Sequence, residues 1–258
     1  MSALSNYHTH STFCDGRDTP EEMVLEAIRL GCPELGFSGH AHVSFDECCM
    51  TVAGTEQYKA EIRRLREKYA GQIRLFLGVE QDYFSDLPTD DYDYVIGSVH
   101  YVWKNGRWLS VDESRESFLQ NVRDCYSGDF YAFAEDYYAL VARVCERTRC
   151  RIVGHFDLIT KFNEGDCLFD TAHPRYRAAA LAALEALTGE PVLFEINTGA
   201  IARGYRRTPY PAPWLLEKLQ ARGAGLILSS DCHDRRFLLC GLEAYRDLPG
   251  VRETLFEK

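Results

Sequence analysis

The sequence predicts an α/β protein in which seven parallel strands alternate with helices. Short apolar segments are separated by segments whose apolar residues recur at helical spacing, and strands joined in this way pair in parallel through right-handed crossovers. The length of 258 residues suits a single barrel, since α/β barrels run to about 250 residues. Nearly every predicted strand also ends in His, Asp or Glu, and α/β barrels build their sites at that edge. A doubly wound open sheet is the alternative architecture.

The predicted elements follow one another without an internal repeat. A first strand is expected to end near residues 8–10. Six further strands are expected at residues 33–40, 73–80, 94–100, 151–155, 192–197 and 225–231. The first helix begins at a capping box, Thr19-Pro20-Glu21-Glu22, and ends at Gly31. Apolar periodicity predicts further helices over residues 55–70, 113–148 with a break at Gly128, 174–188 and 213–222, and after His233.

Composition excludes several functional classes. The net charge is −10, from 29 basic and 39 acidic residues, which disfavours a general nucleic-acid binder. No apolar run approaches the roughly 18 residues of a membrane span, and the N-terminal residues lack the apolar stretch of a signal peptide. The ten cysteines include no C-x-x-C pair, so we expect reduced thiols. We therefore expect a cytoplasmic protein without a nucleic-acid or membrane partner.

His8 and His10 stand two residues apart on the first predicted strand, so their side chains point to the same side. Two converging imidazoles suit a divalent transition ion. Asp15 follows in a loop closed by Gly16. Further imidazoles and carboxylates stand at the ends of later strands, at His40, Glu80, His100, His155, Asp231 and His233. Nine nitrogen or oxygen ligands are too many for one tetrahedral zinc, whereas three neighbouring ions bridged by Glu80 would use them all.

Seven motifs follow one another between residues 7 and 233: His8-Thr9-His10, Phe37-Ser38-Gly39-His40, Gly78-Val79-Glu80-Gln81-Asp82-Tyr83, Tyr94-Val95-Ile96-Gly97-Ser98-Val99-His100, Gly154-His155-Phe156-Asp157-Leu158, Glu195-Ile196-Asn197-Thr198 and Ser230-Asp231-Cys232-His233. Together they resemble the PHP (polymerase and histidinol phosphatase) superfamily, and most closely its monofunctional histidinol-phosphatase branch. This resemblance implies a distorted (β/α)7 barrel, with residues 1–258 forming a single PHP-type domain and the metal site at the C-terminal ends of the strands. The sequence departs from the pattern at Gly39, where many relatives carry an acidic residue.

The resemblance also implies three metal positions, occupied by up to three divalent transition ions (zinc, iron or manganese). The first position would be held by His8, His10, Glu80 and Asp231. The second would be held by Asp15, His40 and His233, and the third by the shared Glu80 with His100 and His155. Glu80, Asp231 and His233 are the implied catalytic residues.

A cluster of divalent ions suits phosphate-ester hydrolysis, because the ions neutralise the phosphate and activate a water. The resemblance accordingly implies a metal-dependent phosphomonoesterase that hydrolyses L-histidinol phosphate to L-histidinol and phosphate in histidine biosynthesis. A PHP-type phosphoesterase acting on nucleotide or cyclic phosphodiester substrates is the alternative. A non-catalytic metal-binding module is a third interpretation, disfavoured because the chain retains all nine ligands.

Two cations just past strand ends, Arg203 and Lys161, are expected to bind the phosphate, and Arg203 is the favoured one. His42, Tyr83 and Tyr101 are further candidates for substrate binding. Aromatic and acidic side chains suit a substrate that carries an ammonium and an imidazole. The expected partner is thus a small-molecule phosphate ester, and the sequence indicates no particular oligomeric state.

Overall fold

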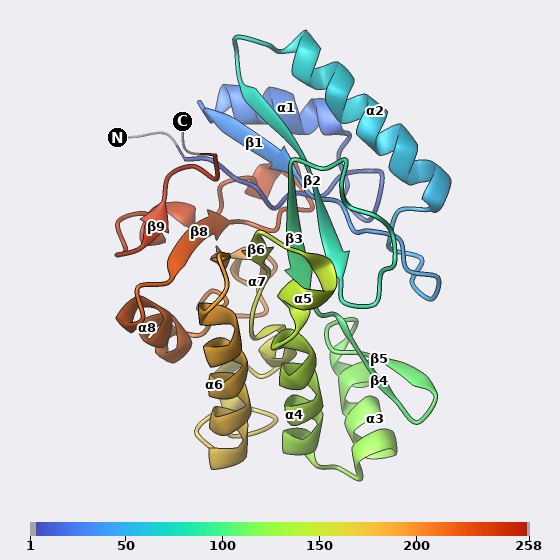
Figure 1. Cartoon of the computed structure of the whole chain (residues 1–258), viewed down its shortest axis with the longest axis vertical. Coiled ribbons are helices and arrows are strands. Elements are labelled where there is room, and N and C mark those ends of the chain that lie inside the picture. Colours follow the sequence, from blue (N-terminus) through green and yellow to red (C-terminus); the bar gives the residue numbers. More distant parts are fainter. Residues whose placement is uncertain (1–3, 257–258) are drawn as a thin grey trace.

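The structure, a computed structural model, describes residues 4–256 and contains a seven-stranded sheet in the order β1-β2-β3-β6-β7-β8-β9 (Figure 1). All neighbouring strands of this sheet pair in parallel. The strands are β1 (Glu34–Phe37), β2 (Arg74–Asp82), β3 (Tyr94–Ser98), β6 (Ile152–Val153), β7 (Leu193–Asn197), β8 (Gly225–Ser229) and β9 (Val251–Arg252).

The N-terminal segment closes the sheet into a distorted barrel. Asn6 pairs in parallel with β1, and Thr9 pairs in parallel with Cys232, just past the end of β8. The segment that carries His8 and His10 therefore lies between β1 and β8. Together with β1, β2, β3, β6, β7 and β8 it supplies the seven strand positions that the sequence predicts, while β9 extends the sheet beyond β8. The predicted (β/α)7 type of barrel is confirmed.

The interior of the barrel changes from apolar to polar toward the carboxyl ends of the strands. Ile96, Leu193 and Ile227 belong to a buried apolar cluster. Side chains alternate along a strand, so the residues two positions further on share the same face. Those residues are Ser98, Glu195 and Ser229, all of them buried. The polar site therefore rests on an apolar layer inside the barrel.

The helices of the crossovers are α1 (Pro20–Arg29), α2 (Val52–Lys68), α3 (Arg115–Tyr126), α4 (Phe130–Val141), α5 (Val144–Thr148), α6 (Pro174–Thr188), α7 (Gly199–Ala202) and α8 (Pro213–Ala221). The predicted capping box is present at α1, where the Thr19 side chain accepts from the Glu22 amide and the Glu22 carboxylate accepts from the Thr19 amide at 2.9 Å. None of the helices within residues 4–256 combines the length and apolar character needed to cross a membrane.

Two helix predictions need correction. The stretch 113–148 divides into α3, α4 and α5, because a second break follows α4 in addition to the predicted one at Gly128, whose φ is 86°. The predicted last helix after His233 is wrong, since the described residues there form only the 3-10 turns η3 (Arg235–Phe237) and η4 (Leu242–Tyr245) before β9. Gly241, with a φ of 78°, separates these turns and leaves no segment long enough for a stable helix.

A hairpin that the sequence analysis did not predict follows β3. Its strands are β4 (Tyr101–Lys104) and β5 (Arg107–Ser110), paired in antiparallel fashion around Asn105 and Gly106. Both turn residues have positive φ, at 53° and 77°. Asn-Gly is the preferred pair for such a two-residue turn, so a signal for the hairpin was present in the sequence.

Candidate metal centre

Glu80, at the carboxyl end of β2, lies at the centre of the predicted ligands and is 1% exposed. Its Oε2 lies 3.1 Å from His8 Nε2, 3.5 Å from His10 Nε2 and 3.0 Å from His40 Nδ1. Its Oε1 lies 2.8 Å from His155 Nε2 and 3.3 Å from His100 Nε2. One carboxylate thus contacts five imidazoles from four different segments of the barrel.

The remaining ligand candidates flank this carboxylate. Asp231 Oδ1 lies 3.3 Å from His10 Nε2, and Asp15 Oδ2 lies 3.1 Å from His233 Nε2. Three groups in the described part of the chain have ligand atoms close enough to hold a metal ion: His8, His10 and Asp231; His10, Asp15, His40 and His233; and His40, Glu80 and His100. Compared with the three positions implied by the resemblance, His10 and His40 each face two groups, and His155 contacts Glu80 without joining the third.

The donor set fits divalent metal ions. His8 Nε2, His10 Nε2 and Glu80 Oε2 are buried, and within residues 4–256 they have no hydrogen-bond partner. Leaving buried polar atoms unpaired costs free energy, whereas a cation between them would satisfy all three. Imidazole and carboxylate ligands without sulfur suit zinc and similar divalent transition ions. The cluster is therefore a binding site for divalent metal.

The charges inside the cluster support the same conclusion. Burial and the positive charges of His233 and His40 lower the pKa of His10 to about 3, so this imidazole is neutral and can offer a lone pair. Burial raises the pKa of Glu80, but the positive charges of His8 and His40 outweigh it and hold the pKa well below its usual range. Glu80 is thus an ionised carboxylate in the barrel interior.

Two residues outside the ligand set lie next to the ligands. Asp82 Oδ2 lies 3.1 Å from His100 Nδ1 and accepts from the His100 amide at 2.9 Å, which orients that ring. Cys14 Sγ lies 3.5 Å from His10 Nδ1. A Cβ at Gly39 would come within 3.2 Å of the same sulfur, so the acidic residue that the family pattern implies at this position would have little space in this chain.

A cavity of about 600 Å³ opens beside the ligands. Its lining combines acids and aromatic rings, namely Asp46, Glu47, Asp112, Glu113, Phe45, Tyr101 and Trp108. Two predicted substrate-binding residues line it. Tyr101 donates its hydroxyl to Asp46 Oδ2 at 2.6 Å, and Lys161 Nζ lies 3.1 Å from Asp112 Oδ2. A cationic small molecule would find complementary charge here.

The other predicted substrate-binding residues differ in position. Arg203, at the end of α7, borders the cluster, and its Nη1 lies 3.1 Å from His233 Nδ1. The structure does not bring His42 and Tyr83 to the ligands. His42 Nδ1 lies 3.1 Å from the Met50 carbonyl oxygen, and the residue lines a neighbouring hollow that shares Phe45 and Trp108 with the cavity. The Tyr83 ring packs against Phe84 instead. Proximity in sequence to His40 and Glu80 was the signal for both residues, and it does not fix the direction of a side chain.

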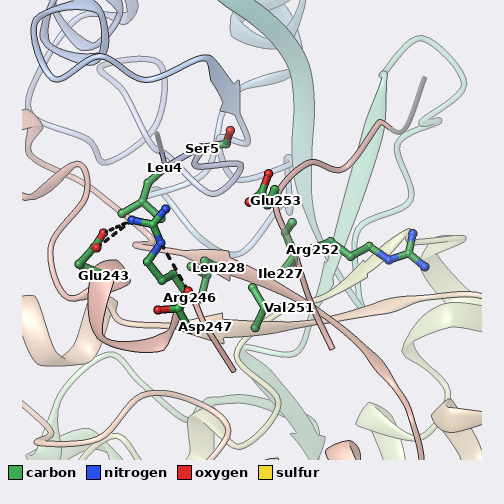
Figure 2. A pocket seen from close by; sticks show the side chains of 10 residues that line it. All are labelled: Leu4, Ser5, Ile227, Leu228, Glu243, Arg246, Asp247, Val251, Arg252 and Glu253. Atoms are coloured by element: carbon green, nitrogen blue, oxygen red, sulfur yellow. Dashed lines mark hydrogen bonds and ion pairs between the residues drawn. The ribbon is translucent and has the colours of Figure 1, made fainter. Parts of the chain in front are cut away.

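A further cavity of about 310 Å³ lies against β8 and β9 (Figure 2). Ile227 and Val251 contribute to its wall, and the guanidinium of Arg246 at its edge pairs with Glu243 at 2.8 Å. None of the nine ligand candidates lines it. The candidate ligands therefore adjoin the other cavity, at the strand ends, and fold and site together define a metal-binding α/β barrel.

Comparison with known proteins gives this class a family. A model of the PHP domain matches residues 6–199. A protein of Deinococcus radiodurans named as a probable histidinol-phosphatase is 31% identical over 248 residues, which cover 90% of this chain and 87% of that protein. The histidinol-phosphatase of Bacillus subtilis is 27% identical over 252 residues, covering 88% of this chain and 92% of the relative. The chain belongs to the PHP family and, within it, to the histidinol-phosphatase branch.

Solved structures have the same fold. A Listeria monocytogenes protein described as a histidinol phosphatase superposes with a TM-score of 0.81 at 22% identity, covering 93% of this chain and 99% of the other. The histidinol phosphate phosphatase of Lactococcus lactis, solved with zinc, L-histidinol and phosphate, gives a TM-score of 0.64 at 22% identity and covers 90% of this chain and 87% of the other.

Proposed function

We propose that this protein is a metal-dependent phosphomonoesterase that hydrolyses L-histidinol phosphate to L-histidinol and phosphate. The observation that carries the proposal is the meeting of the buried His, Asp and Glu cluster with a cavity lined by acids and aromatic rings. The relatives named as histidinol-phosphatases, which match most of this chain, support the same substrate.

The proposed ligands are the nine residues that the sequence singled out, and they would hold up to three divalent ions, with zinc, iron and manganese as candidates. His8, His10, Glu80 and Asp231 are assigned to the first position, Asp15, His40 and His233 to the second, and Glu80, His100 and His155 to the third. Zinc in the Lactococcus lactis relative supports the choice of metal class. Glu80, Asp231 and His233 are the proposed catalytic residues, because they would contact the ions that the reaction requires.

Bound ions of this kind neutralise the phosphate and lower the pKa of the attacking water. The residues of this chain would orient the groups that hold the ions and supply positive charge for the phosphate. Ser98 donates to Glu80 Oε1 at 2.7 Å and holds this carboxylate in place. The side chain of Arg203 is 31% exposed, so N–H groups outside its contact with Asp231 can donate to phosphate oxygens. Lys161, which lines the cavity, would add a second positive charge.

The acids of the cavity are proposed to recognise the cationic end of the substrate. Burial raises the pKa of Asp46, but hydrogen bonds from Tyr101 and from the Cys48 amide help to outweigh this effect. The net shift of the pKa is downward, so the carboxylate is ionised. Asp46 lies beside the aromatic pair formed by Phe45 and Trp108, whose ring centroids are 4.0 Å apart. An ammonium or imidazolium group would be attracted by both the charge and the ring faces.

Release of inorganic phosphate from purified, metal-analysed protein tests the proposal. L-histidinol phosphate should be hydrolysed with a kcat/KM far above that of a panel of nucleotides and cyclic phosphodiesters at equal metal loading. A preference for a nucleotide or a phosphodiester would contradict the proposal and favour the alternative PHP-type phosphoesterase. No release from any substrate by metal-loaded protein would favour a non-catalytic module.

We further propose that residues 1–258 form one PHP-type domain that works in histidine biosynthesis in the cytoplasm. The acidic net charge of −10 supports a small-molecule partner over a nucleic acid. Fractionation of cells that express the tagged protein checks the compartment, and growth of a deletion strain without histidine checks the pathway.

A further inference from the structure

We infer that Glu195, the first residue of the Glu195–Thr198 motif, is a positioning residue that holds two parts of the metal centre at once. It belongs to none of the ligand groups found in the described part of the chain, yet it lies inside the barrel on β7 with 1% of its surface exposed. The inference rests on the ligand assignments of the proposed function.

The Glu195 carboxylate accepts four hydrogen bonds. Oε1 lies 2.5 Å from His8 Nδ1 and 2.6 Å from Ser229 Oγ. Oε2 lies 2.9 Å from the His155 amide nitrogen and 3.1 Å from Asn197 Nδ2. An ionised carboxylate is acceptor-only and offers about four lone-pair positions, so these four donors use its whole capacity.

The contact with His8 determines which nitrogen of that ring can bind a metal. A proton on Nδ1, shared with Glu195, leaves the lone pair on Nε2. Nε2 lies 3.1 Å from Glu80 Oε2 and 3.6 Å from Asp231 Oδ1. Glu195 therefore fixes both the tautomer and the direction of the His8 ring toward the first metal position.

The other oxygen of Glu195 acts on the third position through the backbone. It holds the amide of His155 just past the end of β6, and the Nε2 of this residue lies 2.8 Å from Glu80 Oε1. Within residues 4–256, Glu195 makes no hydrogen bond to Asp15, His40 or His233, the residues assigned to the second position. Loss of the carboxylate should thus weaken two positions and spare one.

Glu195→Gln is the sharpest test because it keeps the size of the side chain. An amide has one oxygen and one NH2 group, so in either orientation two of the four donors would face another donor. We expect a loss of about 10- to 100-fold in affinity for Zn²⁺ and fewer ions retained per chain than in the wild type. The absorption spectrum of the Co²⁺-loaded variant should also change, because the His8 ring is no longer held.

The measurements are Zn²⁺ affinity by competition with a chromophoric chelator and ions per chain by elemental analysis, both on the full chain. Glu34→Gln is the matched control. Glu34 is a buried carboxylate on β1, 1% exposed; it accepts from Tyr7 and Thr254 and pairs with Arg74, and none of these partners is a ligand candidate. The thermal midpoint of unfolding of this variant should be lower than that of the wild type, whereas its affinity for Zn²⁺ should be unchanged.

Wild-type Zn²⁺ affinity in Glu195→Gln would overturn the inference, and so would an equal loss in Glu34→Gln, which would trace the effect to folding. If Glu195→Gln does not fold, Ser229→Ala is measured in its place. It removes one donor from Oε1 and should cost about two- to tenfold in Zn²⁺ affinity, and unchanged affinity would overturn the inference. Wild-type protein that binds Zn²⁺ but leaves L-histidinol phosphate intact would contradict the proposed function alone.

Discussion

Arg203 donates two hydrogen bonds to Asp231, one from Nη1 to the backbone carbonyl oxygen at 2.9 Å and one from Nη2 to Oδ2 at 2.9 Å. The φ of Asp231 is 48°, a left-handed conformation that a non-glycine residue keeps only where its surroundings hold it. Burial raises the pKa of Asp231, but the positive charge of Arg203, together with the neighbouring histidines, outweighs it and holds the pKa well below its usual range. Arg203 therefore supports a proposed metal ligand, in addition to its proposed contact with the phosphate.

Arg203→Ala should lower kcat/KM for L-histidinol phosphate by roughly ten- to a few-hundred-fold, the range expected for losing charge-assisted hydrogen bonds. We expect KM to rise, because the phosphate loses a partner, and metal content to fall, because Asp231 loses its support. Steady-state kinetics and elemental analysis check the two effects. Arg203→Lys should recover only part of the activity, since a point charge cannot reproduce the planar fork. Near-wild-type kcat/KM in Arg203→Ala would show that Arg203 does not bind the phosphate.

Glu80→Gln should reduce metal content and turnover by orders of magnitude. The substitution keeps the size of the side chain but removes the negative charge that five imidazoles surround. Replacing a residue that only hydrogen-bonds to a ligand typically lowers metal affinity or activity about 10- to 100-fold, so replacing a bridging ligand should lower them more. Activity within about tenfold of the wild type would show that Glu80 does not bridge metal positions.

Protein purified without a chelator should carry more than one and up to three divalent ions per chain. Removing them should lower the thermal midpoint, because the metal binds the folded state and the emptied site leaves buried atoms unpaired. Calorimetry before and after chelation, followed by re-addition of zinc, measures the effect. One ion or fewer after reconstitution would contradict the trinuclear assignment.

Asp46→Asn should raise KM for L-histidinol phosphate by roughly tenfold and leave kcat nearly unchanged, because the lost charge would face the cationic end of the substrate. Hydrolysis of p-nitrophenyl phosphate, whose leaving group carries no positive charge, should be affected far less. Asp90→Asn, on an exposed loop outside this cavity, is the matched control. Equal effects on both substrates would argue against recognition of a cation by Asp46.

The convergence of the candidate ligands could be predicted from the sequence because it follows from general rules. Parallel strands end at a common edge, and side chains two residues apart share a face, so polar residues at strand ends must meet. His8, His100 and His155 meet at Glu80 for this reason. The hairpin after β3 also has a local signal in the sequence, the turn pair Asn105 and Gly106.

The sequence by itself thus determined the fold class and the group of residues that gather at the strand ends. Only the tertiary structure decided which of them support one another: Glu195 holds His8 across 187 positions, Arg203 holds Asp231 across 28, and Lys161 pairs with Asp112 across 49. Periodicity and capping are local properties, readable over a few residues. A hydrogen-bond partner depends on distances between separate segments, and those distances are set only when the barrel closes.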